Sequence, residues 1–98
     1  MTQTAKIKYI KPEREVNGRF GSYKSQGVLL EWHDENDQRQ SAYGTFFANH
    51  LDAFQLLNAK AGDMLTVDLV FSISERNGFV SNFIELRNPT FVFENENQ

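Results

Sequence analysis

The stretch from Tyr43 to Ile73 constrains the fold more than any other part of the chain, because the spacing of its apolar residues changes twice. Residues 43–48 are aromatic and include a threonine, a composition that favours a strand. From Met64 onwards apolar and polar residues alternate, which is the period of another strand. The segment between them is too short to carry the chain between parallel strands, so we expect a short helix that closes one end of a barrel.

The spacing within this middle segment is helical. Leu51, Phe54 and Leu57 recur every three residues and form one apolar stripe. The side-chain oxygen of Asn49 can accept hydrogen bonds from the first unpaired N–H groups, so Asn49 is the expected N-terminal cap. Residues 61–63 include a glycine that tolerates the backbone angles at a helix end, and they are the expected stop.

Alternation and strand-forming residues also predict the other strands. Short runs rich in aromatic and β-branched residues are separated by clusters of Gly, Asn, Asp and Ser, which is the pattern of consecutive antiparallel strands. The expected strands cover residues 4–10, 23–32, 39–48, 64–73 and 79–86.

The connections between these strands carry turn-forming residues. Residues 13–22 are expected to form a loop, and the polar residues 33–38 a hairpin loop. Asn77 and Gly78 favour the positive φ angles of a tight two-residue turn. Pro89 should end the last strand, because proline cannot donate a ladder hydrogen bond.

Four residues within the strands and helix carry further expectations. Gly27 lies inside a strand and suggests a bulge or a sharp bend. Phe46 and Phe47 are adjacent in a strand, so one should face the core and the other the opposite side. Phe54 is expected in the core.

The order strand, strand, strand, helix, strand, strand predicts an all-β protein, a five-stranded OB-fold barrel with a short helix between strands 3 and 4. An SH3-like barrel is the nearest rival, but it usually lacks a helix at that position. The 98 residues suffice for one domain. We expect the OB-fold domain over residues 1–93 and a short acidic, disordered tail over residues 94–98.

The composition argues against several functional classes. The chain contains no cysteine, which excludes disulfides and thiolate metal sites. No apolar run approaches the roughly 18 residues of a membrane helix, and the N-terminus lacks the apolar segment of a signal peptide. We therefore expect a soluble, cytoplasmic protein with no membrane partner.

Catalytic and metal-binding patterns are also missing from the sequence. No serine has the setting of a nucleophile elbow, and no glycine-rich loop has phosphate-binding spacing. The acidic loop that begins at His33 lacks the spacing of a calcium site. We expect no enzyme activity, no cofactor and no metal.

The formal net charge is −3, but the charges are unevenly distributed. Residues 1–30 carry six basic and two acidic side chains, whereas residues 31–98 carry four basic and eleven acidic ones. Charges further apart than about 10 Å are largely screened, so the local field decides what a surface attracts. A basic N-terminal region on an acidic protein can therefore bind phosphate.

Several short motifs follow one another in a characteristic order. They are Lys6-Ile7 with Pro12-Glu13, Tyr23-Lys24-Ser25-Gln26 before Val28-Leu29-Leu30-Glu31, Phe47 with Asn49, Leu51-Asp52-Ala53-Phe54, Lys60-Ala61-Gly62-Asp63 with Leu65-Thr66-Val67, and Asn77-Gly78 before Ile84. Through them the chain, over residues 4–88, resembles a small bacterial and phage OB-fold family of unknown function, related in fold to single-stranded DNA-binding proteins. The resemblance implies the OB fold more directly than it implies an activity.

Binding of unpaired nucleic acid needs cations for the phosphates and flat side chains on which bases stack, at about 1–3 kcal/mol per base. In an OB-fold both gather on strands 2 and 3 and on the loops that join strands 1 to 2 and 4 to 5. Basic and aromatic residues interleave at these positions. The candidate nucleic-acid-binding residues are Arg14, Arg19, Phe20, Tyr23, Lys24, Arg39, Tyr43, Arg76 and Phe79.

The sequence therefore predicts sequence-independent binding of single-stranded DNA in replication, recombination or repair. RNA could use the same stacking residues, and a homo-oligomer and replication or recombination proteins are further candidate partners. The alternative is a protein-interaction or oligomerisation OB module without nucleic-acid binding. Nine phenylalanines, more than a small core needs, and the acidic C-terminal two thirds favour that alternative. A purely structural interpretation of the candidate residues is also open, in which Tyr23 and Tyr43 cover core edges and the arginines form surface ion pairs.

Overall fold

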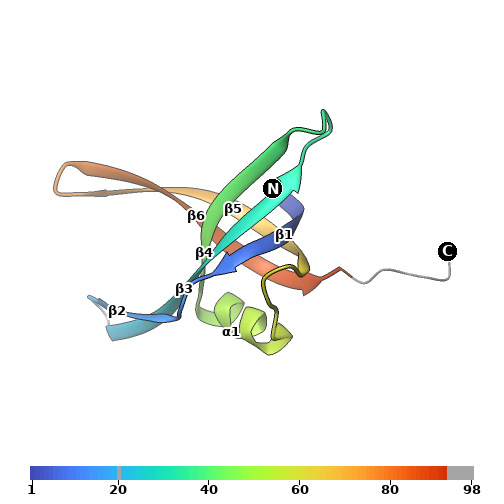
Figure 1. Ribbon diagram of the computed structural model, residues 1–98. Coiled ribbons are helices and arrows are strands. Elements are labelled where there is room, and N and C mark those ends of the chain that lie inside the picture. Colours follow the sequence, from blue (N-terminus) through green and yellow to red (C-terminus); the bar gives the residue numbers. More distant parts are fainter. Residues whose placement is uncertain (20, 93–98) are drawn as a thin grey trace.

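The chain is mostly β, as its sequence predicts. A computed structural model describes residues 1–19 and 21–92 (Figure 1). Phe20, Phe93 and the expected tail over residues 94–98 lie outside the described residues. The elements are β1 (Thr2–Ile10), β2 (Arg14–Gly18), β3 (Gly21–His33), β4 (Arg39–Phe47), α1 (Ala48–Leu57), β5 (Met64–Arg76) and β6 (Phe79–Phe91).

Five of these strands pair in a closed ring. β1 pairs antiparallel with β3 and β5, β3 pairs antiparallel with β4, and β5 pairs antiparallel with β6. The ring closes where β4 and β6 run parallel, with Thr45 opposite Glu85 and Phe46 opposite Leu86. β2 lies outside the ring and pairs with β3. The short helix lies between β4 and β5, at the predicted position.

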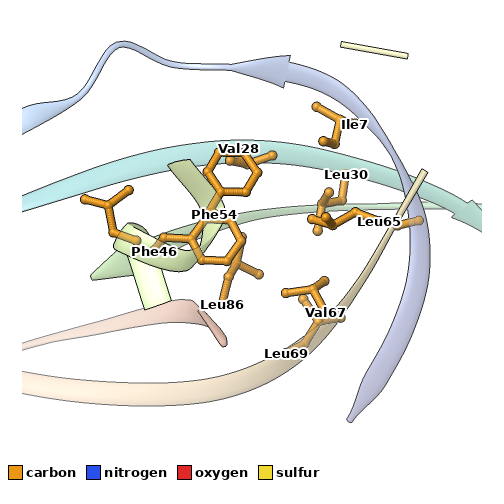
Figure 2. Close-up of a cluster of buried hydrophobic side chains, with 11 residues drawn as sticks. Ile7, Val28, Leu30, Phe46, Phe54, Leu65, Val67, Leu69 and Leu86 are labelled. Atoms are coloured by element: carbon orange, nitrogen blue, oxygen red, sulfur yellow. The ribbon is translucent and has the colours of Figure 1, made fainter. Parts of the chain in front are cut away.

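Alternate residues of the ring strands point inward and form the core. The ring of Phe46 from β4 stacks on that of Phe54 from α1, with centroids 4.4 Å apart and an interplanar angle of 15° (Figure 2). Phe54 is therefore a core residue, as predicted, and of the adjacent Phe46 and Phe47 it is Phe46 that faces the core, while Phe47 points to the other side of β4. The buried apolar side chains are Ala5, Ile7, Val28, Leu30, Phe46, Leu51, Phe54, Leu65, Val67, Leu69 and Leu86.

Both expected helix boundaries are wrong. The N-cap is Phe47, which makes no side-chain capping hydrogen bond, and Asn49 lies inside the first turn. Phe47 is held extended by its pairing with Ser25, so β4 leads directly into the helix without a polar cap. The helix ends at Asn58, whose φ of 53° is left-handed, so the 61–63 turn comes after the helix end. Among the described residues no helix is long and apolar enough to cross a membrane.

The predicted loop 13–22 is in large part a β-hairpin, so the described residues form six strands where the sequence predicts five. Arg14 pairs with Ser25 and Val16 with Tyr23, and the two strands meet at Gly18 and Gly21. Residues 13–22 are rich in charged residues and glycine. Such a composition is typical of a loop, and the sequence does not show that this segment pairs with β3. The additional strand is β2, and it pairs with the part of β3 that lies beyond the ring.

The predicted break at Pro89 is also wrong, because β6 continues to Phe91. The β5–β6 pairing shifts between Thr66 and Asp68, and the one extra residue on β6 places the proline where a ladder N–H is not needed. The Asn88 amide donates to a carboxylate oxygen of Asp68 at 2.9 Å. This hydrogen bond is the main cause of the lowered pKa of Asp68, and a second one from Thr2 lowers it further.

The two predicted hairpin turns are present. Asn77 and Gly78 both have positive φ angles, 53° and 81°, as the tight turn requires. In the other turn the Asp34 carboxylate accepts the backbone N–H groups of Asn36 and Gln38, each at 2.9 Å. The bond from Gln38 is the main cause of the lowered pKa of Asp34. The acid in this loop therefore stabilises the turn.

Candidate nucleic-acid interface

The side of β3 and β4 that faces away from the core carries most of the candidate aromatic residues. Because side chains alternate along a strand, the residues between the buried Val28, Leu30 and Phe46 point outward. We call this surface the outer face. It consists of Tyr23, Ser25, Gly27, Leu29 and Glu31 of β3 and Arg39, Ser41, Tyr43, Thr45 and Phe47 of β4.

Tyr43 lies at the centre of the outer face and packs across Gly27. A Cβ atom on Gly27 would lie 1.9 Å from the phenol oxygen of Tyr43, so a larger residue at this position would force the ring to move from where it lies. Gly27 pairs regularly with Thr45, and the irregularity in the β1–β3 pairing lies on β1 between Ile7 and Tyr9. Of the two expectations for Gly27, a bulge or a sharp bend, the bulge is therefore wrong, and the glycine permits a close approach of the Tyr43 ring.

A cation covers the Tyr43 ring. The ammonium of Lys11 lies 4.7 Å from the ring centroid, and the Lys11 backbone N–H donates to the carbonyl of Gly27 at 2.9 Å. The hydrogen bond fixes where Lys11 leaves β1, so the side chain extends over the ring. Tyr43 still exposes 45% of its surface. The cluster thus combines a flat, accessible ring with a positive charge.

Tyr23 and Phe47 form a second aromatic pair on the outer face. Their ring centroids lie 5.9 Å apart with an interplanar angle of 57°, and Tyr23 remains 46% exposed. Arg14 lies on the same face as these two rings. It pairs with Ser25, and Ser25 pairs with Phe47. Residues that are paired across strands share a face of the sheet. Tyr23 and Tyr43 are accessible, so the reading in which they cover core edges is not favoured.

The predicted basic residues are only partly brought together. Arg39 lies on the outer face, four residues and therefore about 13 Å along β4 from Tyr43. Arg19 lies in the turn between β2 and β3. Lys24 alternates to the side opposite Tyr23, where its ammonium lies 3.8 Å from a carboxylate oxygen of Glu13. Within residues 1–19 and 21–92, neither Arg19 nor Arg39 forms an ion pair.

The acids of this region are neutralised. Glu31 on the outer face lies 3.9 Å from the ammonium of Lys8, and Glu85, which pairs with Thr45, forms an ion pair with Arg87. With these acids paired, Lys11 is the charge that lies at the Tyr43 ring, although the whole chain is acidic.

Arg76 and Phe79 lie away from the outer face, at the tip of the hairpin formed by β5 and β6, where they pair with each other. This hairpin and the β2–β3 hairpin both project beyond the ring on the left of Figure 1. Phe79 is largely exposed. Phe79 and Phe83 are four residues apart on β6 and share a side of the hairpin with Glu85, which adjoins the outer face at Thr45.

Phe47 and Lys11 lie on this candidate interface but were not among the binding residues predicted from the sequence. Phe47 could have been found, because strict alternation from Tyr43 through Thr45 places it on the same side. Lys11 had a weaker signal, since only the β1–β3 pairing shows that residue 11 reaches Gly27. Phe20, the remaining candidate, lies outside the described residues.

The fit between Gly27 and Tyr43 leads to a testable prediction. Gly27→Ala should displace the end of the Tyr43 ring, remove its contact with Lys11 and lower the free energy of unfolding by about 0.5–1 kcal/mol, the usual value of a cation–π contact at an exposed site. Urea denaturation measures this loss. In a Tyr43→Ala background the same substitution should cost almost nothing, because the three nearest atoms to the added Cβ all belong to Tyr43. An equal cost in both backgrounds would contradict the packing described.

No protein-family model matches this chain, and a search of curated proteins finds no match either. The resemblance to the small bacterial and phage OB-fold family therefore remains an expectation from the sequence.

Proposed function

We propose that the ring is an OB-fold barrel. When β2 is left out, β1, β3, β4, β5 and β6 correspond to strands 1 to 5 of the expected fold. Strand 1 then pairs with strand 2, strand 2 with strand 3, strand 3 in parallel with strand 5, strand 5 with strand 4, and strand 4 with strand 1. With the helix between the third and fourth strands, this order supports the Greek-key barrel expected from the sequence. The β2–β3 hairpin and the β5–β6 hairpin then occupy the two loop positions that flank the ligand face of that fold.

We further propose that the outer face binds single-stranded DNA without sequence specificity. The observation that carries this proposal is the cluster of Tyr43, Lys11 and Gly27, with Tyr23, Phe47 and Arg14 beside it. Accessible rings offer stacking platforms to any base, and the neighbouring cations offer contacts to phosphates. A role in replication, recombination or repair is the setting in which such binding would be used.

The position of Lys11 suggests how a strand is accepted. In the free protein its ammonium lies over the Tyr43 ring, a cation–π contact worth about 0.5–1 kcal/mol at an exposed site. A stacked base is worth about 1–3 kcal/mol, so the base can displace the ammonium from the ring. The long lysine side chain then reaches the adjacent phosphate, and the charge that covers the free ring becomes a backbone contact.

This proposal is tested by fluorescence anisotropy with labelled oligo-dT. We expect micromolar or tighter binding at low salt. Three phosphate contacts, from Lys11, Arg14 and Arg39, predict a slope of about −2 for log affinity against log salt, or roughly 16-fold weaker binding when the salt concentration rises fourfold. The absence of binding at low salt would reject the proposal.

A matched pair of variants shows whether Lys11 is involved. Lys11→Gln should make the salt slope shallower by about 0.7, the value for one lost contact on a single strand. Lys60→Gln removes the same charge from the turn after α1 and should leave the slope unchanged. Equal effects of the two substitutions would show that only net charge matters.

A further inference from the structure

The hairpin formed by β5 and β6 extends the core into solvent. Leu69 and Leu86 are the last buried pair, and the next pairs on the same face are Phe71 with Ile84 and Ile73 with Asn82. Beyond them Val80 follows on that face, opposite Glu75. We call residues 71–84 the arm, and the side that carries Phe71, Ile73, Val80 and Ile84 its inner face.

The inner face is strongly exposed. Phe71, Ile73 and Val80 leave 68%, 74% and 65% of their surfaces accessible. Beside them, where the arm leaves β4, lies an open groove of about 510 Å³. Its lining residues are Tyr43, Phe71, Ser72, Ile73, Asn82, Phe83 and Ile84. Contiguous apolar surface of this kind usually marks an interaction site.

The arm also has open edges. The pairing of β5 with β1 ends at Asp68, and that of β6 with β4 begins at Glu85, so within the described residues the arm is a two-stranded ribbon. An isolated two-stranded ribbon is at best marginally stable in water. Long apolar edge strands are usually protected by lysine, proline or a covering element, and the arm contains neither lysine nor proline.

We propose that the inner face packs against the inner face of the arm of a second copy of this chain, around a two-fold axis. The charge of the arm favours a second copy as the partner. Glu75 and Arg76 are the only charged residues of the arm, and their charges cancel. Two copies of an acidic chain can thus approach through a neutral element. Because both copies present the same patch, the contact closes on itself as a dimer.

The size of the patch sets the strength of this dimer. Few large apolar side chains of each copy are exposed on the inner face, so the contact is small compared with the roughly 1,200–2,000 Å² that stable specific interfaces bury. We therefore expect a reversible dimer with a dissociation constant in the micromolar range. Tyr43 lines the groove beside Phe71 and Ile73, so its ring lies at the margin of such a dimer, whereas Tyr23, Phe47 and Arg14 lie further along the outer face.

Sedimentation equilibrium of the full chain tests the proposal, over about 1–500 µM protein. The average mass of the wild type should rise from 11.3 kDa towards twice that value. Ile73→Lys, and independently Val80→Lys on the other strand, should keep the mass at the monomer value throughout. Leu56→Lys, which adds the same charge at an 86% exposed position on α1, should dimerise like the wild type. Since all three side chains are exposed, circular dichroism should show unchanged folding.

Three results would overturn the proposal. A wild type that stays monomeric at every concentration shows that the inner face does not associate. Dimers of Ile73→Lys and Val80→Lys as strong as the wild type place the contact elsewhere. A monomeric wild type whose oligo-dT binding is lost in Ile73→Lys would assign the inner face to nucleic acid. Because oligo-dT binding and its salt dependence are measured in separate experiments on the wild type, the absence of a dimer leaves the proposed function intact.

Discussion

Replacing Tyr23 and Tyr43 together by alanine is expected to weaken oligo-dT binding roughly 30-fold or more. Each ring can support one stacked base, worth about 1–3 kcal/mol, and about 1.4 kcal/mol corresponds to a factor of ten in affinity. Both rings are close to half exposed, so most of their loss should fall on binding and little on folding. Anisotropy at fixed salt measures the effect, together with thermal melting of each variant.

Two controls make this result specific to the rings. Leu56→Ala removes an exposed apolar side chain from α1, away from the outer face, and should leave the affinity unchanged. Phenylalanine at positions 23 and 43 keeps the stacking surface and should retain most of the binding. Unchanged affinity in the double alanine variant would show that the outer face does not hold the bases.

Phe46→Ala is expected to lower the free energy of unfolding by about 3–5 kcal/mol, the usual cost of truncating a buried phenylalanine. Phe46 is fully buried, and its ring stacks on Phe54, so its loss opens a cavity where β4 meets α1 (Figure 2). Urea denaturation with an unchanged m-value measures this loss.

Phe79→Ala is the matched control, since it removes the same side chain from a position that is 78% exposed. Its cost should stay below about 0.5 kcal/mol. Similar losses at positions 46 and 79 would contradict the burial pattern on which the inner and outer faces are defined.

Much of the fold follows from the order of the residues. The alternation from Met64, the helical stripe through Phe54 and the Asn77-Gly78 turn each report a local period, and local periods can be read without knowing what lies opposite. The two wrong assignments at residues 13–22 and at Pro89 share a cause. In both places a partner strand decides the outcome, through the β2–β3 pairing in one and the β5–β6 register shift in the other.

The candidate interface was predictable only in part for the same reason. Tyr23, Tyr43 and Arg39 were found because alternation and the expected fold place them on one face. Lys24 was grouped with Tyr23 because the two are adjacent in the sequence, although adjacent strand residues point to opposite sides. The alternation from Leu65 predicted one apolar face through Phe71 and Ile73, but it could not show that the ring ends at Leu69 and leaves both residues exposed.

The most direct test of the nucleic-acid interface is an amide chemical-shift titration of isotope-labelled protein with oligo-dT at low salt. We predict that the largest shifts occur at Tyr23, Gly27, Tyr43 and Phe47, with smaller ones at Lys11 and Arg14. The amides of α1 and of Ile73 and Val80 should change little. Shifts confined to α1 or to the inner face of the arm, or no shifts at all, would contradict the proposal that the outer face binds the strand.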